Sequence, residues 1–371
     1  MINLFQELVD KIAEYVSTCD GDHDPHCSGT WWWNTNRRNL KACALVSPAF
    51  LAASQRSLFR SFTIRPRSAA LAGFAQKPHL AGYVRDLRIN APNGICSILI
   101  RVLPLFGGVT RLVVDPLGAS SLRAPSQSVF ALLLEFPSLR FLALVNCIEV
   151  PASFIHGALS SFKEVALINT TVIEDNSPVN YFDAPTLDRL IVDCSPQDDT
   201  VMRVLERWKS SLPTPGALEL SVQKNQRFLG GHELAQIYST SLTALVIHFP
   251  EDNHNFGTIV VPHLPGIRFL TLRASDHSLS YPCTLCTTIA VLSRRMANLE
   301  RLTLVLAAPC LSSFYSSLRD HRIDEALKEL PHLQQVHIRG CVVNGGEVVP
   351  MTRYSPRTLE SPFPWPTRRG Y

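Results

Sequence analysis

The chain has 371 residues, of which 46% are hydrophobic and 18% charged, a balance typical of a folded protein with a large core. The formal net charge of +4 is small and dispersed, which argues against nucleic acid as a partner, and no apolar run reaches the roughly 18 residues of a membrane span. Charged residues within positions 1–16 argue against a signal peptide, and ten dispersed cysteines indicate reduced thiols in the cytoplasm or nucleus.

The first sixty residues predict three short helices. Apolar side chains at helical spacing, including Leu8 and Ile12, predict the first helix within residues 1–16. A second helix is expected over residues 37–45. Ser47 followed by Pro48 is typical of a helix start and places a third helix over residues 48–59. Three such helices could form a compact module ahead of the rest of the chain.

This segment resembles a known motif. The run L-F-Q-E-L-V-D-K-I-A-E-Y-V, followed by N-L-K-A-C-A-L-V-S-P-A-F, resembles the F-box, in particular that of divergent fungal F-box proteins. Phe5 replaces the usual proline of the family, and Phe50 replaces the usual tryptophan. In this family the F-box binds a Skp-type adaptor of a cullin-RING ubiquitin ligase. The resemblance implies an adaptor-binding surface made from Leu4, Leu8, Ile12, Leu45, Val46, Pro48 and Phe50. The alternative is a helical cap that only shields the segment that follows.

An insertion of residues 17–36 separates the first two predicted helices. It contains Cys19, His23, His26 and Cys27, which are residue types that can bind zinc. Their spacing matches no standard structural zinc site, so we expect a polar loop without metal. The three tryptophans at 31–33 are expected to pack back on the helices, because large aromatic side chains are usually buried.

Residues 63–344 repeat a unit of the form L-x-x-L-x-L, which is clearest at residues 139–144. Its alternation predicts a short strand with one buried face, and the copies lie 23 to 34 residues apart. The fourth positions of the copies are Leu87, Leu112, Leu142, Val165, Leu190, Leu218, Leu245, Leu270, Leu302 and Val336. This pattern predicts an α/β fold, an irregular leucine-rich-repeat solenoid with a curved parallel sheet and helices on its convex side.

The segments between the strands are amphipathic and predict helices, for example over residues 68–80, 152–161 and 198–211. Cys147 stands three residues after the last strand leucine, where such repeats place Asn or Cys, and Thr170 is a small substitute at that position. The C-x-x-C of Cys283 and Cys286 lacks a second pair and a redox context, so we expect two helix-start thiols. Without a catalytic motif, the sequence predicts no catalytic residue, no metal and no cofactor.

The residues between the buried leucines should line the opposite, concave face of the sheet. That face is predicted to bind the substrate through Phe141, Phe269, Arg273, Arg301, His337 and Arg339. Arginine pairs bidentately with carboxylate and phosphate, which favours an acidic or phosphorylated segment. The alternative is that these arginines only keep the protein soluble. Residues 345–371 are rich in Pro and Arg and predict a disordered tail.

Together these features predict the substrate-recognition subunit of a Skp–cullin–F-box ubiquitin ligase. Its helical domain, residues 1–62, would bind the adaptor, and its repeats would hold a protein substrate that the sequence does not name. Such a subunit acts by raising effective concentration and needs no active site of its own. The alternative is a leucine-rich-repeat scaffold that binds a protein partner without an adaptor. Neither alternative involves nucleic acid or a membrane.

Overall fold

The computed structural model shows an α/β protein with two compact units, Met1–Asp183 and Ala184–Tyr371. No helix in the described part of the chain is long and apolar enough to cross a membrane. The structure describes residues 6–13, 40–45, 48–64, 69–90, 102–115, 132–175, 187–194, 200–208, 214–222, 234–249, 263–275, 291, 294–308, 327, 330, 332–342 and 348–354. The predicted loop at 17–36 and the C-x-x-C lie outside these residues.

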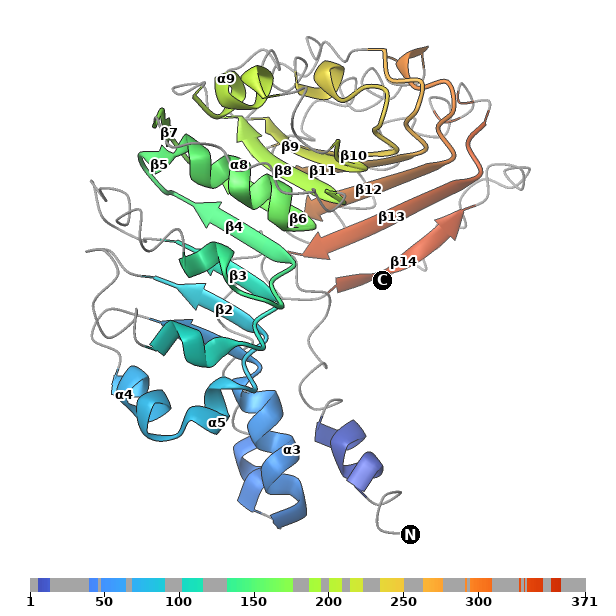
Figure 1. Cartoon of the computed structure of the whole chain (residues 1–371). Helices are drawn as coiled ribbons and strands as arrows, with labels where there is room; N and C mark the ends of the chain where they lie inside the picture. The colour runs from blue at the N-terminus through green and yellow to red at the C-terminus, as the bar shows by residue number, and fades with distance from the viewer. Residues whose placement is uncertain are drawn as a thin grey trace, which may run out of the picture. The chain divides into compact units, whose positions relative to one another are not determined.

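The first unit begins with helices and continues as a parallel sheet (Figure 1). Residues 6–13 and 40–45 are helical. The elements that follow are α3 (Pro48–Phe59), β1 (Ser61–Ile64), α4 (Ala69–Gln76), α5 (Pro78–Ala81), β2 (Asp86–Ile89), the 3-10 helix η1 (Leu103–Phe106), β3 (Arg111–Val114), β4 (Phe141–Val145), β5 (Val150–Pro151), α8 (Ala152–Ser161), β6 (Glu164–Ile168) and β7 (Val172–Ile173).

Five strands of this unit form one parallel sheet in the order β1-β2-β3-β4-β6, and β5 pairs with β7 beside it. The predicted fourth positions are direct register partners, because Leu87 pairs with Leu112, Leu112 with Leu142 and Leu142 with Val165. All four side chains are buried. The fourth positions of the L-x-x-L-x-L pattern thus coincide with the register, since they mark the one apolar face that each strand must bury.

The second unit holds six parallel strands, with β14 added antiparallel to β13 (Figure 1). The remaining fourth positions, from Leu190 to Val336, are again register partners along the row β8-β9-β10-β11-β12-β13. The elements are β8 (Arg189–Cys194), α9 (Thr200–Arg207), β9 (Ala217–Val222), β10 (Ala244–Phe249), β11 (Phe269–Ser275), β12 (Arg301–Ala308), β13 (Gln335–Val342) and β14 (Val348–Tyr354).

The helix predicted over residues 68–80 is divided into α4 and α5, while the other two named segments agree with the sequence. Helix α8 has the predicted bounds, 152–161, while α9 falls inside the predicted 198–211. The Asp175 carboxylate accepts a hydrogen bond from the backbone N–H of Ser153, 2.8 Å away, and so satisfies one free donor in the first turn of α8. Strand β1 crosses the predicted boundary at residues 62 and 63, and β14 lies within the predicted tail.

The carboxyl ends of the strands in the first unit are held by short hydrogen-bonding side chains. The thiol of Cys147 lies 3.7 Å from the Val114 carbonyl oxygen, and the Thr170 hydroxyl donates to the Leu144 carbonyl at 3.1 Å. Both residues are buried, as expected of the position three residues beyond the last strand leucine. At these two turns the small polar side chain therefore contacts the carbonyl end of the preceding strand.

Candidate functional site

The helical module at the start of the first unit has its own small core. Val9 and Ala13 from the 6–13 helix pack with Leu40 from the 40–45 helix and Ala53 from α3. Phe50 and Leu58 of α3 are partly buried against this cluster. The i, i+4 spacing of Val9 and Ala13 places both on one face of their helix, so that face is already occupied.

A second set of apolar side chains on the same helices is exposed. Leu8 is 56% and Ile12 40% exposed, and they share a face of the 6–13 helix at i, i+4 spacing. Leu45, at the end of the 40–45 helix, is 88% exposed, and Leu51 of α3 is 43% exposed. We call these four residues the exposed apolar set. Fully burying such a side chain contributes roughly 1.5–3 kcal/mol, so burial of the set could contribute favourable free energy to binding a protein partner.

The residues that the F-box resemblance assigned to the adaptor-binding surface do not all belong to the exposed apolar set. Leu8, Ile12 and Leu45 are exposed, whereas Phe50 packs on the module's own core. Leu4 and Val46 lie outside the described residues, as does the side chain of Pro48, although Pro48 does begin α3. Sequence reasoning missed Leu51. Its place three residues after Pro48, within the predicted third helix, was the available signal.

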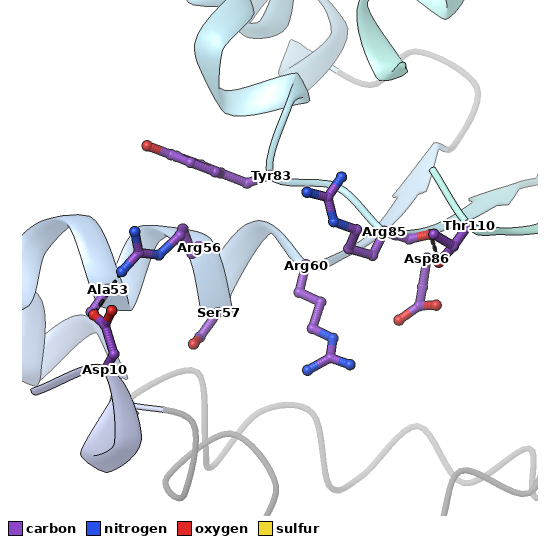
Figure 2. A pocket seen from close by; sticks show the side chains of 9 residues that line it. All are labelled: Asp10, Ala53, Arg56, Ser57, Arg60, Tyr83, Arg85, Asp86 and Thr110. Carbon is purple, nitrogen blue, oxygen red and sulfur yellow. Dashed lines mark hydrogen bonds and ion pairs between the residues drawn. The ribbon is translucent and has the colours of Figure 1, made fainter. Parts of the chain in front are cut away.

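A pocket of about 480 Å³ lies where the module meets the first strands (Figure 2). Three arginines line it, Arg56 and Arg60 from the end of α3 and the turn after it, and Arg85 just before β2. We call this the arginine pocket. The other lining residues are Asp10, Ala53, Ser57, Tyr83, Asp86 and Thr110. Sequence reasoning did not single out any of the three arginines.

Backbone hydrogen bonds fix the backbone positions of Arg60 and Arg85. The carbonyl of Arg60 accepts from the N–H groups of Arg85 and Asp86, at 2.8 and 2.9 Å. The carbonyl of Arg85 accepts in the same way from Thr110 and Arg111, at 2.8 and 3.0 Å. The backbone carbonyl of the residue before each of these strands thus accepts hydrogen bonds from the start of the next strand. The backbones of Arg60, Arg85 and Thr110 therefore lie side by side at the amino ends of the strands.

The charges in the arginine pocket are only partly neutralised. The Asp10 carboxylate forms an ion pair with Arg56 at 2.6 Å, and the Asp86 carboxylate accepts from the Ser61 hydroxyl at 3.1 Å. Arg85 donates to a neutral acceptor, the carbonyl of Gly108, at 2.7 Å. In Figure 2, Arg56 turns toward Asp10, Arg85 lies on the side of Tyr83, and Arg60 points to the other side of the ribbon. The guanidinium groups are thus spread along the pocket.

Gly108 makes the position of Arg85 possible. A Cβ atom on Gly108 would lie 1.7 Å from Nη1 of Arg85 and 3.1 Å from the carbonyl oxygen of Gly82. Any other residue at Gly108 would therefore displace the arginine side chain. The loop before β3 consequently fixes the direction of Arg85 as well as its backbone.

The predicted substrate-binding residue of the first unit is Phe141, and it is buried. The Arg111 guanidinium lies over its ring, 3.9 Å from the ring centroid, in cation–π geometry. Ala143 and Ala166 on the same strand face are also buried. The apolar part of this face is therefore enclosed, while Arg111 is half-buried over it.

The second unit brings Phe269, Arg301 and His337 into neighbouring positions. Phe269 and Arg301 are register partners, and the Arg301 guanidinium lies 5.2 Å from the Phe269 ring centroid. Arg301 donates to the Gln335 side-chain oxygen at 3.0 Å, and His337 Nε2 lies 3.4 Å from the same oxygen. Arg273 and Arg339 belong to β11 and β13, but their side chains lie outside the described residues.

In comparisons with known proteins, this sequence matches no family model and no curated protein. Among the described residues, no group of three or more His, Cys, Asp and Glu side chains is arranged to hold a metal ion. The exposed apolar set and the arginine pocket are two surface features among the described residues of the first unit.

Proposed function

We propose that this protein is the substrate-recognition subunit of a Skp–cullin–F-box ubiquitin ligase. In this proposal the parallel strands belong to an irregular leucine-rich-repeat solenoid, and the helical module is a divergent F-box. The cytoplasm or nucleus is the compartment that such a role requires. The protein itself carries no active site; it would hold a substrate close to an enzyme bound elsewhere in the complex.

The observation that carries the proposal is the exposed apolar set. The module satisfies its own core with Val9, Ala13, Leu40 and Ala53, yet Leu8, Ile12, Leu45 and Leu51 remain exposed. A cap that only shielded the repeats would not require large apolar side chains exposed to water. Exposed apolar side chains gathered on one module are typical of a protein-binding surface.

The test is co-expression of the full chain with a Skp-type adaptor, followed by purification through the chain. We expect the wild type to retain the adaptor and the Leu8→Asp/Ile12→Asp variant to lose it, since a buried carboxylate at the interface has no partner. The matched control is Ile148→Asp, which changes another exposed apolar residue of the first unit, 37% exposed and outside the module. Adaptor binding that survives the double change, or is equally lost in the control, contradicts the proposal.

The adaptor-independent scaffold would give a different result. The full chain would then never retain the adaptor, although both variants and the wild type would fold equally well. Thermal unfolding of all three proteins separates this outcome from simple misfolding, because the changed side chains are exposed and should alter stability little.

A further inference from the structure

The arginine pocket is one end of a longer line of basic side chains. In each repeat, the second position of L-x-x-L-x-L stands immediately before the strand. In the first unit these positions hold Arg60, Arg85, Thr110, Arg140 and Lys163 in spatial order, because the strands that they precede are consecutive register partners. We call Arg60, Arg85, Arg140 and Lys163 the basic row. All four side chains are exposed.

The same backbone bonds hold the whole row. After the contacts of Arg60 and Arg85, the Thr110 carbonyl accepts from the Arg140 N–H at 2.9 Å, and the Arg140 carbonyl accepts from the Glu164 N–H at 2.9 Å. Neighbouring strands are about 4.8 Å apart, so the five positions extend over roughly 19 Å. Backbone hydrogen bonds therefore connect neighbouring positions of the row, and their spacing follows that of the strands.

The basic row is a feature of the first unit and not of the repeat itself. The equivalent positions in the second unit are Asp188, Gly216, Thr243, Arg268, Glu300 and Gln334. There the one cation, Arg268, is held by Glu300 through two hydrogen bonds of 2.7 and 2.9 Å, which lower the pKa of the Glu300 carboxyl. The second unit thus pairs the one cation of its row internally.

Acidic groups also adjoin the basic row, and Lys163 and Glu164 each make a further interaction. Asp10 pairs with Arg56, and Asp86 accepts from Ser61. Glu164 begins β6 beside Lys163. Within the part of the chain that the structure describes, Arg60 and Arg140 form no ion pair. The row and the arginine pocket together therefore carry an excess of positive charge.

We propose that the basic row and the arginine pocket bind an acidic segment of a protein partner. The segment would cross the amino-terminal ends of the strands in the first unit. An extended peptide rises about 3.3 Å per residue, so roughly six residues span the row. Alternate side chains point the same way, and their carboxylates would meet a basic group about every second residue. The spread of the guanidinium groups favours several carboxylates in line over one compact anion.

Nucleic acid fits this surface less well. Tyr83 is the one aromatic side chain lining the described pocket, and a single line of four cations is narrow for a polyphosphate backbone. The formal charge of the whole chain is only +4. An acidic peptide needs neither stacking surfaces nor a broad basic face.

The experiment measures binding of a fluorescein-labelled peptide of alternating Glu and Ser, about twelve residues long so that it exceeds the row, to the purified full chain. The neutral reference is the same peptide with Gln in place of Glu. We expect binding of the Glu peptide at least about tenfold tighter than that of the Gln peptide, and its loss as salt rises from about 50 mM to about 500 mM.

Variants then locate the site. The Arg60→Gln/Arg85→Gln variant should bind the Glu peptide about tenfold more weakly, at roughly threefold for each exposed charge contact. The Arg140→Glu variant, which reverses one exposed charge, gives an independent test if the double variant does not fold. Arg268→Gln is the matched control, because it removes a cation from the equivalent row of the second unit, and it should bind like the wild type.

Three results would overturn the proposal. These are equal binding of the Glu and Gln peptides, unchanged affinity in both first-unit variants, and displacement of the peptide by a thymidine oligonucleotide at lower concentration than by unlabelled peptide. The last would assign the row to nucleic acid. The assay contains no adaptor, so its outcome is independent of the ubiquitin-ligase proposal.

Discussion

The ion pair between Arg88 and Asp115 offers a sharp test of how the strand ends of the first unit are stabilised. Asp115 follows β3 and its side chain is only 2% exposed, while that of Arg88 in β2 is 46% exposed. The carboxylate accepts hydrogen bonds from the Arg88 guanidinium and from the Asn146 amide, the latter at 3.2 Å. The perturbation is Arg88→Met, which keeps the length of the side chain and removes its charge.

The magnitude follows from the burial of the two partners. Removing one partner of a fully buried ion pair costs about 3–5 kcal/mol, because the other charge stays buried without compensation. Here the half-exposed guanidinium is already screened by water, and Asn146 still donates to the carboxylate. We therefore expect Arg88→Met to lower the free energy of unfolding by about 1–3 kcal/mol.

Urea unfolding followed by circular dichroism measures this change. The control is Arg140→Met, a removal of an exposed arginine that should stay within about 0.5 kcal/mol of the wild type. In the double variant Arg88→Met/Asp115→Asn the buried charge is absent, so its cost should be clearly smaller than the sum of the two single costs. The reasoning is refuted if Arg88→Met behaves like the control or if the two single costs simply add.

Three further predictions address the core and two buried titratable side chains. Leu142→Ala should cost about 2–5 kcal/mol in urea unfolding, since Leu142 is fully buried at a fourth position, whereas Leu45→Ala should cost under about 0.5 kcal/mol. Equal costs would show that the fourth positions do not form the core. Burial lowers the pKa of His156 below its ordinary 6.5, so the unfolded state binds protons more readily. Stability should be fully present above pH 6.5 and fall as the pH drops below it, and His156→Phe should remove that slope. Burial also raises the pKa of the Cys147 thiol to about 12, so pulse alkylation with peptide mapping should label Cys147 only on unfolding. Rapid labelling of Cys147 in the native protein would contradict its burial.

The strand register is predictable from the sequence because it depends on a local rule. A strand with one buried face repeats apolar residues at period two, and the fourth and sixth positions of each copy satisfy that rule. The rule alone aligns Leu112 with Leu142 as neighbours, and the two residues are indeed register partners. The same rule does not predict which residues of the helices are buried, because that burial depends on contacts between helices.

The division of the helical module is not predictable for that reason. Leu8 and Val9 are adjacent, equally apolar and in the same helix, yet one is exposed and the other lies in the core with Ala53. Only the packing of three helices decides between them. Phe50 matches the F-box pattern as well as Leu45 does, but it faces inward.

The basic row is visible in the sequence, but no periodicity of apolar residues marks it. Its members occupy the second position of L-x-x-L-x-L, whereas the prediction of a binding face used the positions between the buried leucines, which include Phe141 and Arg301. The arginine pocket also depends on Arg56 from α3, whose approach to the row is a tertiary contact. The burial of Phe141 under Arg111 likewise depends on the neighbouring strand.

Hydrogen–deuterium exchange of the full chain, with and without a purified Skp-type adaptor, tests the central proposal most directly. If the exposed apolar set binds the adaptor, residues 6–13, 40–45 and the start of α3 should exchange more slowly in its presence, while β8 to β13 should not change. No protection anywhere, or protection confined to the second unit, would contradict the assignment of the helical module as an F-box.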